Sequence, residues 1–167
     1  MPNWNYNDIV LYGSKETMKP ICDKVDDIRK DGLLKTLLPM PSELNETSSP
    51  TRIVSQEERD EQIKVRDEWD NSPLPIQERT PKYRPMVNIT REISEDFRRK
   101  FNYDNWYDWS IWNWGTKWND SPIGYEDKYD VSVSIGEDES QLRIHCMTPW
   151  CEPSNACLLY TSDAADE

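Results

Sequence analysis

The sequence is short of the residue types from which metal centres, disulfide frameworks and phosphate-binding loops are built. Its 167 residues include one histidine, four cysteines and five glycines. The glycines are isolated from one another, which argues against a glycine-rich loop for a nucleotide phosphate. No two cysteines stand in a Cys-x-x-Cys pair, which argues against a zinc or iron–sulfur site. We therefore expect neither a metal nor a cofactor.

Apolar residues are also scarce, and negative charge outweighs positive charge. Hydrophobic residues make up 35% of the chain, against about 45–50% in ordinary globular domains. We therefore expect one compact core and a large polar segment outside it. No apolar run approaches the roughly 18 residues of a membrane span, and no secretory leader opens the sequence. We expect a cytoplasmic protein with no membrane contact and with reduced thiols. The net charge of −12 disfavours binding to nucleic acid phosphates.

Tryptophan, by contrast, is abundant, and five of the eight tryptophans fall within residues 105–118, NWYDWSIWNWGTKW. These five, which form the candidate interaction surface, are Trp106, Trp109, Trp112, Trp114 and Trp118. Asn105 can cap a helix with Asp108 three positions on, and Gly115 suits the left-handed residue past a helix end, so a helix is expected over residues 106–114. The rings either pack in a core or form an exposed platform that stacks a base, a sugar or a cation.

The N-terminal part of the chain predicts a strand followed by a helix. Residues 4–12 alternate between two faces and end at a glycine, and the later half of this strand is expected to be buried on both faces. Ser14 offers a helix cap, and apolar residues recur at helical spacing up to Asp31. Pro20 lies inside this helix if Ser14 caps it, whereas capping by Thr17 would place Pro20 in the first turn. We expect a distorted first turn. Residues 33–40 are apolar and are expected to be extended.

Residues 45–100 are polar and rich in proline, and we interpret them as an insertion into the domain. Within them, residues 56–69 and 90–101 predict helices with thin apolar stripes. After the tryptophan segment, residues 128–135 and 141–148 alternate on either side of a turn, which predicts a hairpin with one buried face. The expected architecture is a single α+β domain with an antiparallel sheet and helices on one face.

Several segments of the sequence resemble those of a family of phage and plasmid proteins that carry the YubB-type ferredoxin-like domain. These segments are MPNWNYNDIVLYGS, LLPMPSELNETSSP, ITREISEDF with NWYDWSIWNWGTKW, and MTPWCEP. The resemblance covers most of residues 1–153 and implies a ferredoxin-like β-α-β-β-α-β fold, a mobile-element origin and no known active site. At Cys151 the resembling proteins more typically carry serine, which weakens any fixed role for this thiol.

The last eleven residues, CLLYTSDAADE, resemble the translation of a transposon-end sequencing adapter. We expect residues 157–167 to be an assembly artefact and the domain to span residues 1–156, interrupted before its last helix and strand. Removing Asp163, Asp166 and Glu167 from the net charge of −12 leaves −9. Three cysteines then remain, and an odd number argues against a closed disulfide framework. The missing strand would pair beside the first, which predicts an open edge and uncovered apolar surface.

The sequence favours recognition over catalysis. His145 and Cys146 are neighbours on a predicted strand and so point to opposite faces, which removes them as a catalytic pair or as joint metal ligands. Asp104 and Asp108 could do acid–base work, but Asp108 is explained as a first-turn residue. We expect a non-catalytic domain that binds a protein partner through the tryptophan helix and the polar insertion. The alternatives are a ligand- or nucleic-acid-binding module that uses exposed tryptophans, and an acidic DNA mimic that inhibits a host enzyme.

Overall fold

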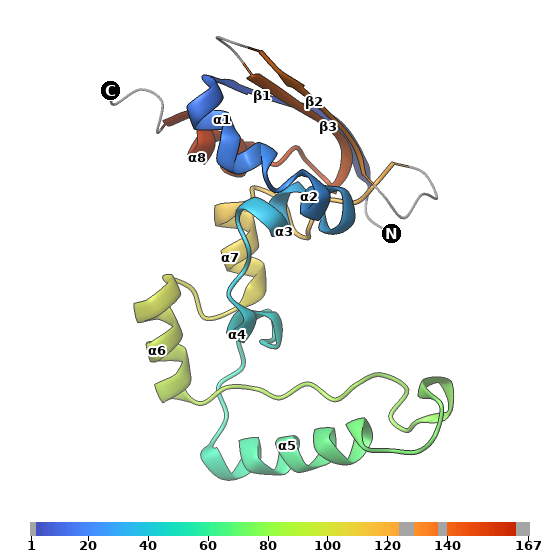
Figure 1. Cartoon of the computed structure of the whole chain (residues 1–167). Coiled ribbons are helices and arrows are strands. Elements are labelled where there is room, and N and C mark those ends of the chain that lie inside the picture. Colours follow the sequence, from blue (N-terminus) through green and yellow to red (C-terminus); the bar gives the residue numbers. More distant parts are fainter. Residues whose placement is uncertain (1–2, 124–128, 137–139, 163–167) are drawn as a thin grey trace. The chain divides into compact units, whose positions relative to one another are not determined.

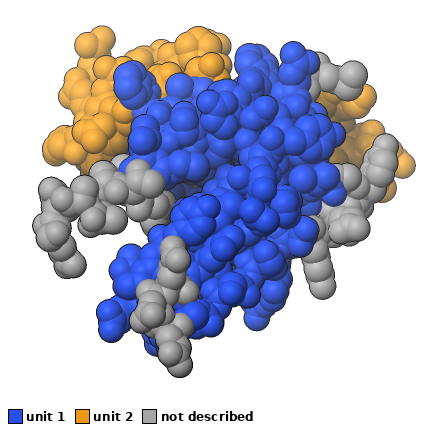
Figure 2. All heavy atoms as spheres, turned by 90° about the horizontal axis from the view of Figure 1, so that it is seen from above, with its two compact units in different colours: residues 1–39, 110–167 blue, residues 40–109 orange. Residues whose placement is uncertain are grey.

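A computed structural model of the chain describes residues 3–123, 129–136 and 140–162. The chain divides into two compact units, one made of Met1–Pro39 with Ser110–Glu167 and the other of Met40–Trp109 (Figure 2). We call the first the sheet unit and the second the insertion unit. Helix α7 (Trp106–Asn113) spans the boundary in sequence, so its first half belongs to the insertion unit and its second half to the sheet unit.

The sheet unit is a mixed α+β structure with one antiparallel sheet. Its remaining elements in chain order are β1 (Trp4–Gly13), α1 (Lys15–Cys22), α2 (Val25–Asp31), α3 (Leu33–Leu37), β2 (Asp130–Ile135), β3 (Ser140–Pro149) and α8 (Ser154–Ser162). The strand order is β1-β3-β2 with antiparallel neighbours, so β1 and β2 form the two edges. Figure 1 shows α1 and α2 on the same side of this sheet.

The core of the sheet unit lies between that side of the sheet and its helices. In β3 the side chains of Leu142, Ile144 and Cys146 are fully buried and alternate with more exposed residues, which confirms the predicted half-buried hairpin. Burial of each large aliphatic side chain contributes about 1.5–3 kcal/mol to stability. The residues packed against these three come from both helices and strands, and they are Met18, Val25, Ile28, Leu33, Tyr129 and Val131. Position 128 and most of the predicted turn lie outside the described residues.

The opposite face of the sheet is the more exposed one. On β1, Tyr6 is 70% exposed and Tyr12 is 64% exposed, and Trp4 also reaches solvent. The prediction that the later half of this strand is buried on both faces is therefore wrong at Tyr12, because the helices of this unit pack on the other face. Between the two tyrosines, the carboxylate of Asp8 pairs with Arg143 across the strands at 3.2 Å.

The helix predicted from Ser14 to Asp31 is two helices. Ser14 caps α1 as expected, since its hydroxyl accepts a hydrogen bond from the backbone N–H three residues later at 3.3 Å. Pro20 lies inside α1, yet the interruption comes after it, at Asp23 and Lys24, where α1 ends and α2 has not begun. There Lys24 donates its backbone N–H to the carbonyl of Ile21 at 3.0 Å, which forms a 3₁₀-type turn. The expected distortion of the first turn is therefore wrong.

Residues 33–37 form helix α3, although the sequence predicts an extended conformation for residues 33–40. The cause is a pair of side chains far along the chain. The carboxylate of Asp120 accepts the backbone N–H groups of Leu33 at 2.9 Å and Leu34 at 3.0 Å, and the side-chain oxygen of Asn119 accepts that of Lys35 at 3.0 Å. Three of the four N–H groups that a helix start leaves unpaired are thus satisfied by tertiary contacts, which local sequence does not reveal.

The insertion unit is largely helical. Besides the first half of α7, its elements are α4 (Ser42–Asn45), α5 (Gln56–Asp70), η1 (Ile76–Glu78) and α6 (Arg91–Phe101). The two predicted helices are confirmed as α5 and α6, and each begins at a hydroxyl cap, Ser55 for α5 and Thr90 for α6. A parallel bridge between Ile53 and Ile89 joins the segments that precede these helices.

A helix also follows β3. This is helix α8 (Ser154–Ser162), and most of its residues belong to the segment that resembles a translated adapter. None of the helices in the described part of the chain is both long and apolar enough to cross a bilayer.

Candidate interaction surface

The structure divides the five predicted surface tryptophans between the interior and solvent. Helix α7 begins as predicted, because the side-chain oxygen of Asn105 accepts the backbone N–H of Asp108 at 2.9 Å. It ends at Asn113, and Gly115 adopts the expected left-handed conformation with φ of +80°. Of the five rings, Trp109 and Trp114 are buried, Trp106 is partly buried, and Trp112 and Trp118 are exposed.

The buried tryptophans are packed into the interior of the protein. The indole N–H of Trp114 donates to the carbonyl of Leu38 at 2.9 Å within the sheet unit, and this satisfies the one polar atom of the ring. Trp106, in the insertion unit, donates its backbone N–H to the hydroxyl of Thr47 at 2.9 Å. Of the five rings predicted to form an interaction surface, Trp109 is 6% exposed and Trp114 is 5% exposed, so little of either ring is open to a partner.

The exposed rings include a sixth tryptophan that the sequence pattern did not indicate. Lys117 places its Nζ 4.5 Å from the ring centroid of Trp118 and 5.5 Å from that of Trp150. Trp150 is 62% exposed and Trp118 is 40% exposed. Two indoles thus share one ammonium group, and each such contact contributes about 0.5–1 kcal/mol at an exposed position. We call Lys117, Trp118 and Trp150 the tryptophan–lysine site.

Hydrogen bonds to β3 and to the residues after it hold this site in place. The hydroxyl of Thr116 donates to the carbonyl of Pro149 at 2.9 Å, and Ser121 and Met147 exchange backbone hydrogen bonds. On the other side of the site, the backbone N–H of Trp150 donates to the carbonyl of Asn3 at 2.7 Å. Both segments that carry the tryptophans are therefore fixed to the sheet, and the rings are presented on a rigid support.

Trp150 has a conformation that marks it as unusual. Its backbone φ angle is +79°, a value that residues other than glycine adopt rarely. It follows directly on Pro149, the last residue of β3, where the chain leaves the sheet. The only signal in the sequence is its place after a proline at the end of a predicted strand, and that signal says nothing of the ring's contact with Lys117.

Asp104 and Asp108, the two carboxylates considered for acid–base catalysis, accept hydrogen bonds from neighbouring side chains of the insertion unit. Asp104 is 3% exposed and accepts hydrogen bonds from the Ser94 hydroxyl at 2.5 Å, the Thr51 hydroxyl at 2.7 Å and the Arg98 Nε at 2.8 Å. Burial alone would raise the pKa of this carboxyl, but those hydrogen bonds hold it below its ordinary value of 3.8. Asp108 accepts the side-chain N–H of Asn105 at 2.8 Å at the start of α7.

The cysteines and the histidine do not converge. His145 and Cys146 occupy opposite faces of β3, as predicted, since Cys146 is fully buried and His145 lies on the partly exposed face near Asp8. Within residues 3–123, 129–136 and 140–162, no three side chains of His, Cys, Asp and Glu gather in a group that could hold a metal ion.

We expect a thiol reagent to modify Cys151 in the folded chain well before Cys146. Cys151 is exposed, whereas burial raises the pKa of the Cys146 thiol and so suppresses the reactive thiolate. Alkylation with iodoacetamide followed by peptide mass spectrometry measures both rates, and Cys151→Ser should remove the fast event. Rapid alkylation of Cys146 without unfolding would contradict its place in the core.

Comparison with protein-family models, with curated proteins and with solved structures found no match.

Proposed function

We propose that this chain is a non-catalytic protein-recognition module that binds its partner through the tryptophan–lysine site. The observation that carries the proposal is the pair of exposed indoles of Trp118 and Trp150, which both contact the ammonium group of Lys117. Tryptophan is among the residues most enriched at the energetic centres of protein interfaces. The hydrogen bonds that fix Thr116 and Trp150 to their neighbours reduce the conformational entropy that binding would cost.

A stacking site for nucleic acid bases is the second candidate for the same rings. Exposed aromatic side chains bind single-stranded nucleic acids when a positively charged groove follows the backbone. The net charge of −12 opposes binding to a nucleic acid backbone. The aromatic faces can bind a protein partner without a positively charged groove. Protein recognition is therefore the better-supported function.

We also propose that the sheet unit follows a ferredoxin-like path and that the chain is an accessory protein of a phage or plasmid, in line with its resemblance to the YubB-type family. The strand order β1-β3-β2 and the helices after β1 and β3 support that path. The fourth strand of such a unit would lie beside β1, whose outer edge pairs with no strand in the part of the chain that the structure describes. An experimental structure with that strand beside β2 would exclude the path.

The proposed surface can be tested by placing a photo-crosslinking amino acid at one position at a time in bacterial cells. We expect crosslinkers at Trp118 and at Trp150 to give the same discrete protein adduct, identified by mass spectrometry. Tyr83 is a matched control, because it is an exposed aromatic with a lysine over its ring, Lys82 Nζ at 5.8 Å, but lies in the insertion unit. The crosslinker at Tyr83 should not give that adduct.

With the captured partner purified, Trp118→Ala and Trp150→Ala should each weaken its binding by about 2 kcal/mol, or roughly thirtyfold. Tyr83→Ala should leave the affinity unchanged. Adducts with nucleic acid at Trp118 and Trp150 would favour the stacking alternative. The same adducts at all three positions would show that the tryptophan–lysine site has no special part in recognition.

A further inference from the structure

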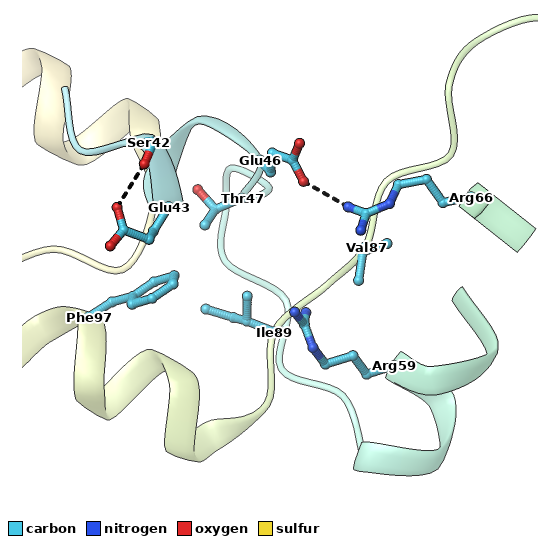
Figure 3. A pocket seen from close by; sticks show the side chains of 9 residues that line it. All are labelled: Ser42, Glu43, Glu46, Thr47, Arg59, Arg66, Val87, Ile89 and Phe97. Carbon is cyan, nitrogen blue, oxygen red and sulfur yellow. Dashed lines mark hydrogen bonds and ion pairs between the residues drawn. The ribbon is translucent and has the colours of Figure 1, made fainter. Parts of the chain in front are cut away.

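The insertion unit contains a cavity of about 300 Å³ that the tryptophan–lysine site does not involve. Its walls come from α4 and the residues after it, from α5, from the segment before α6 and from α6 itself (Figure 3). The volume lies at the lower end of the range for small-molecule pockets, which is about 300–1,000 Å³. The cavity is therefore large enough for a small organic ligand.

Three apolar side chains, those of Val87, Ile89 and Phe97, line one part of the cavity, which we call its floor, and polar residues line the rest. Val87 and Ile89 are buried, and Phe97 of α6 is partly buried beside them. Figure 3 shows Phe97 and Ile89 next to each other, facing the space below Thr47. Apolar side chains that line a cavity have unused contact surface, and a ligand's hydrocarbon group can supply the missing contacts. The floor thus selects for a ligand with an apolar part.

Two arginines, Arg59 and Arg66, and two glutamates, Glu43 and Glu46, line the cavity. Arg59 and Arg66 are two turns apart on α5, so both point from the same face of that helix. Arg66 pairs with Glu46 at 2.8 Å, and its buried Nε has no hydrogen-bond partner among the described residues. Arg59 donates to the backbone carbonyl of Asn88, and within the described chain it forms no ion pair with a carboxylate.

Arg59 therefore supplies a positive charge beside an apolar floor. A guanidinium presents five N–H donors in a flat fork that matches a carboxylate, and the hydrogen bond to Asn88 uses one of its nitrogens. In Figure 3 the Arg59 guanidinium lies on one side of Ile89 and Phe97, and Glu43 lies on the other. The hydroxyl of Ser42 donates to Glu43 at 3.1 Å at the exposed rim. An anion is thus favoured at the Arg59 end and disfavoured at the Glu43 end.

We propose that this cavity binds a small monocarboxylate that carries a short branched or aromatic hydrocarbon group. The carboxylate pairs with the guanidinium of Arg59, and the hydrocarbon group covers Val87, Ile89 and Phe97. This site is independent of the tryptophan–lysine site, so failure of one proposal leaves the other standing.

The test is a titration of the full-length chain with 4-methylvalerate, followed by NMR of the methyl signals of Val87 and Ile89. We expect saturable shifts of these signals, and no such shifts with 4-methylvaleramide, which has the same shape without the charge. Inorganic phosphate at the same concentration should not compete, because it has no apolar part. Saturation with the amide as readily as with the carboxylate would overturn the proposal, as would the absence of saturable shifts with the carboxylate.

Variants of Arg59 test the role of the guanidinium. Arg59→Gln keeps an N–H donor for the Asn88 carbonyl but removes the charge, and we expect affinity for 4-methylvalerate to fall at least about tenfold. Arg59→Lys keeps the charge without the fork and should lose less. Arg52→Gln is the matched control, since Arg52 is an exposed arginine of the same unit that pairs with Glu58 at 3.0 Å and does not line the cavity. Equal affinity in Arg59→Gln and Arg52→Gln would overturn the proposal.

Discussion

Replacing Asp104 by alanine is expected to destabilise the insertion unit locally while the sheet unit stays folded. The substitution leaves the buried hydroxyl of Ser94, the hydroxyl of Thr51 and the Nε of Arg98 without their shared acceptor. Each such loss costs about 1–3 kcal/mol when the group is buried, and Arg98 is largely exposed, so we expect a total of roughly 2–4 kcal/mol. Hydrogen exchange of peptides from α6 and the first turn of α7 should accelerate about 30- to 1,000-fold.

The control for Asp104→Ala is Asp108→Ala. Asp108 is an exposed carboxylate four residues away with one side-chain hydrogen bond, to Asn105 at 2.8 Å, and its loss should cost less than about 1 kcal/mol. Because the pKa of Asp104 lies below 3.8 in the folded chain, its contribution is present above about pH 3.8 and is lost as pH falls through the folded value. Peptides from β3 serve as the internal reference, and equal acceleration of β3 and α6 would contradict a local role for Asp104.

Between about pH 4 and pH 7 the wild-type chain is expected to lose stability relative to Asp120→Asn. Burial raises the pKa of Asp120 to about 6, against an ordinary value of 3.8, although the backbone N–H groups of Leu33 and Leu34 favour the carboxylate. The folded-state value lies above the unfolded one, so the contribution of the protonated carboxyl is complete below pH 3.8 and is lost as pH rises through about 6. At 1.36 kcal/mol per pKa unit the change is on the order of 3 kcal/mol.

Urea unfolding of both chains across this pH range, followed by circular dichroism, measures the difference directly. Asparagine is neutral at every pH used, so the wild-type stability minus the variant stability should fall as pH rises and level off above about pH 7. The effect comes from burial and not from exposed charges, so added salt should leave the slope unchanged. A difference that stays constant with pH would show that Asp120 has the same pKa in the folded and unfolded chains.

Features with a local cause were predictable from the sequence. The alternation in β1, β2 and β3 follows from one buried sheet face, and the starts of α5, α6 and α7 follow from the caps Ser55, Thr90 and Asn105. In each case the residues that form the element also carry the signal for it. The burial of Trp109 against the exposure of Trp112 was not predictable, because the polar residues of α7, which are Asp108, Ser110 and Asn113, are interspersed with its aromatic residues and mark no single polar side of the helix.

Features with a distant cause could not be predicted. Helix α3 depends on Asn119 and Asp120, and the tryptophan–lysine site joins Lys117 to Trp150 across more than thirty residues of sequence. The cavity beside Arg59 likewise combines four separate segments. Spacing within a segment reports which residues share a face, but not which other segment meets that face.

The capping of α3 also bears on the order in which the chain acquires structure. A five-residue helix is not stable alone in water, and the acceptor for the Leu34 N–H is Asp120, 86 residues further on. During synthesis, α3 therefore stays unformed until Asn119 and Asp120 have left the ribosome. Closing so long a loop is slow compared with forming local helices. Residues 33–37 should accordingly be among the last parts of the sheet unit to become protected in a refolding experiment, although they lie near its N-terminus.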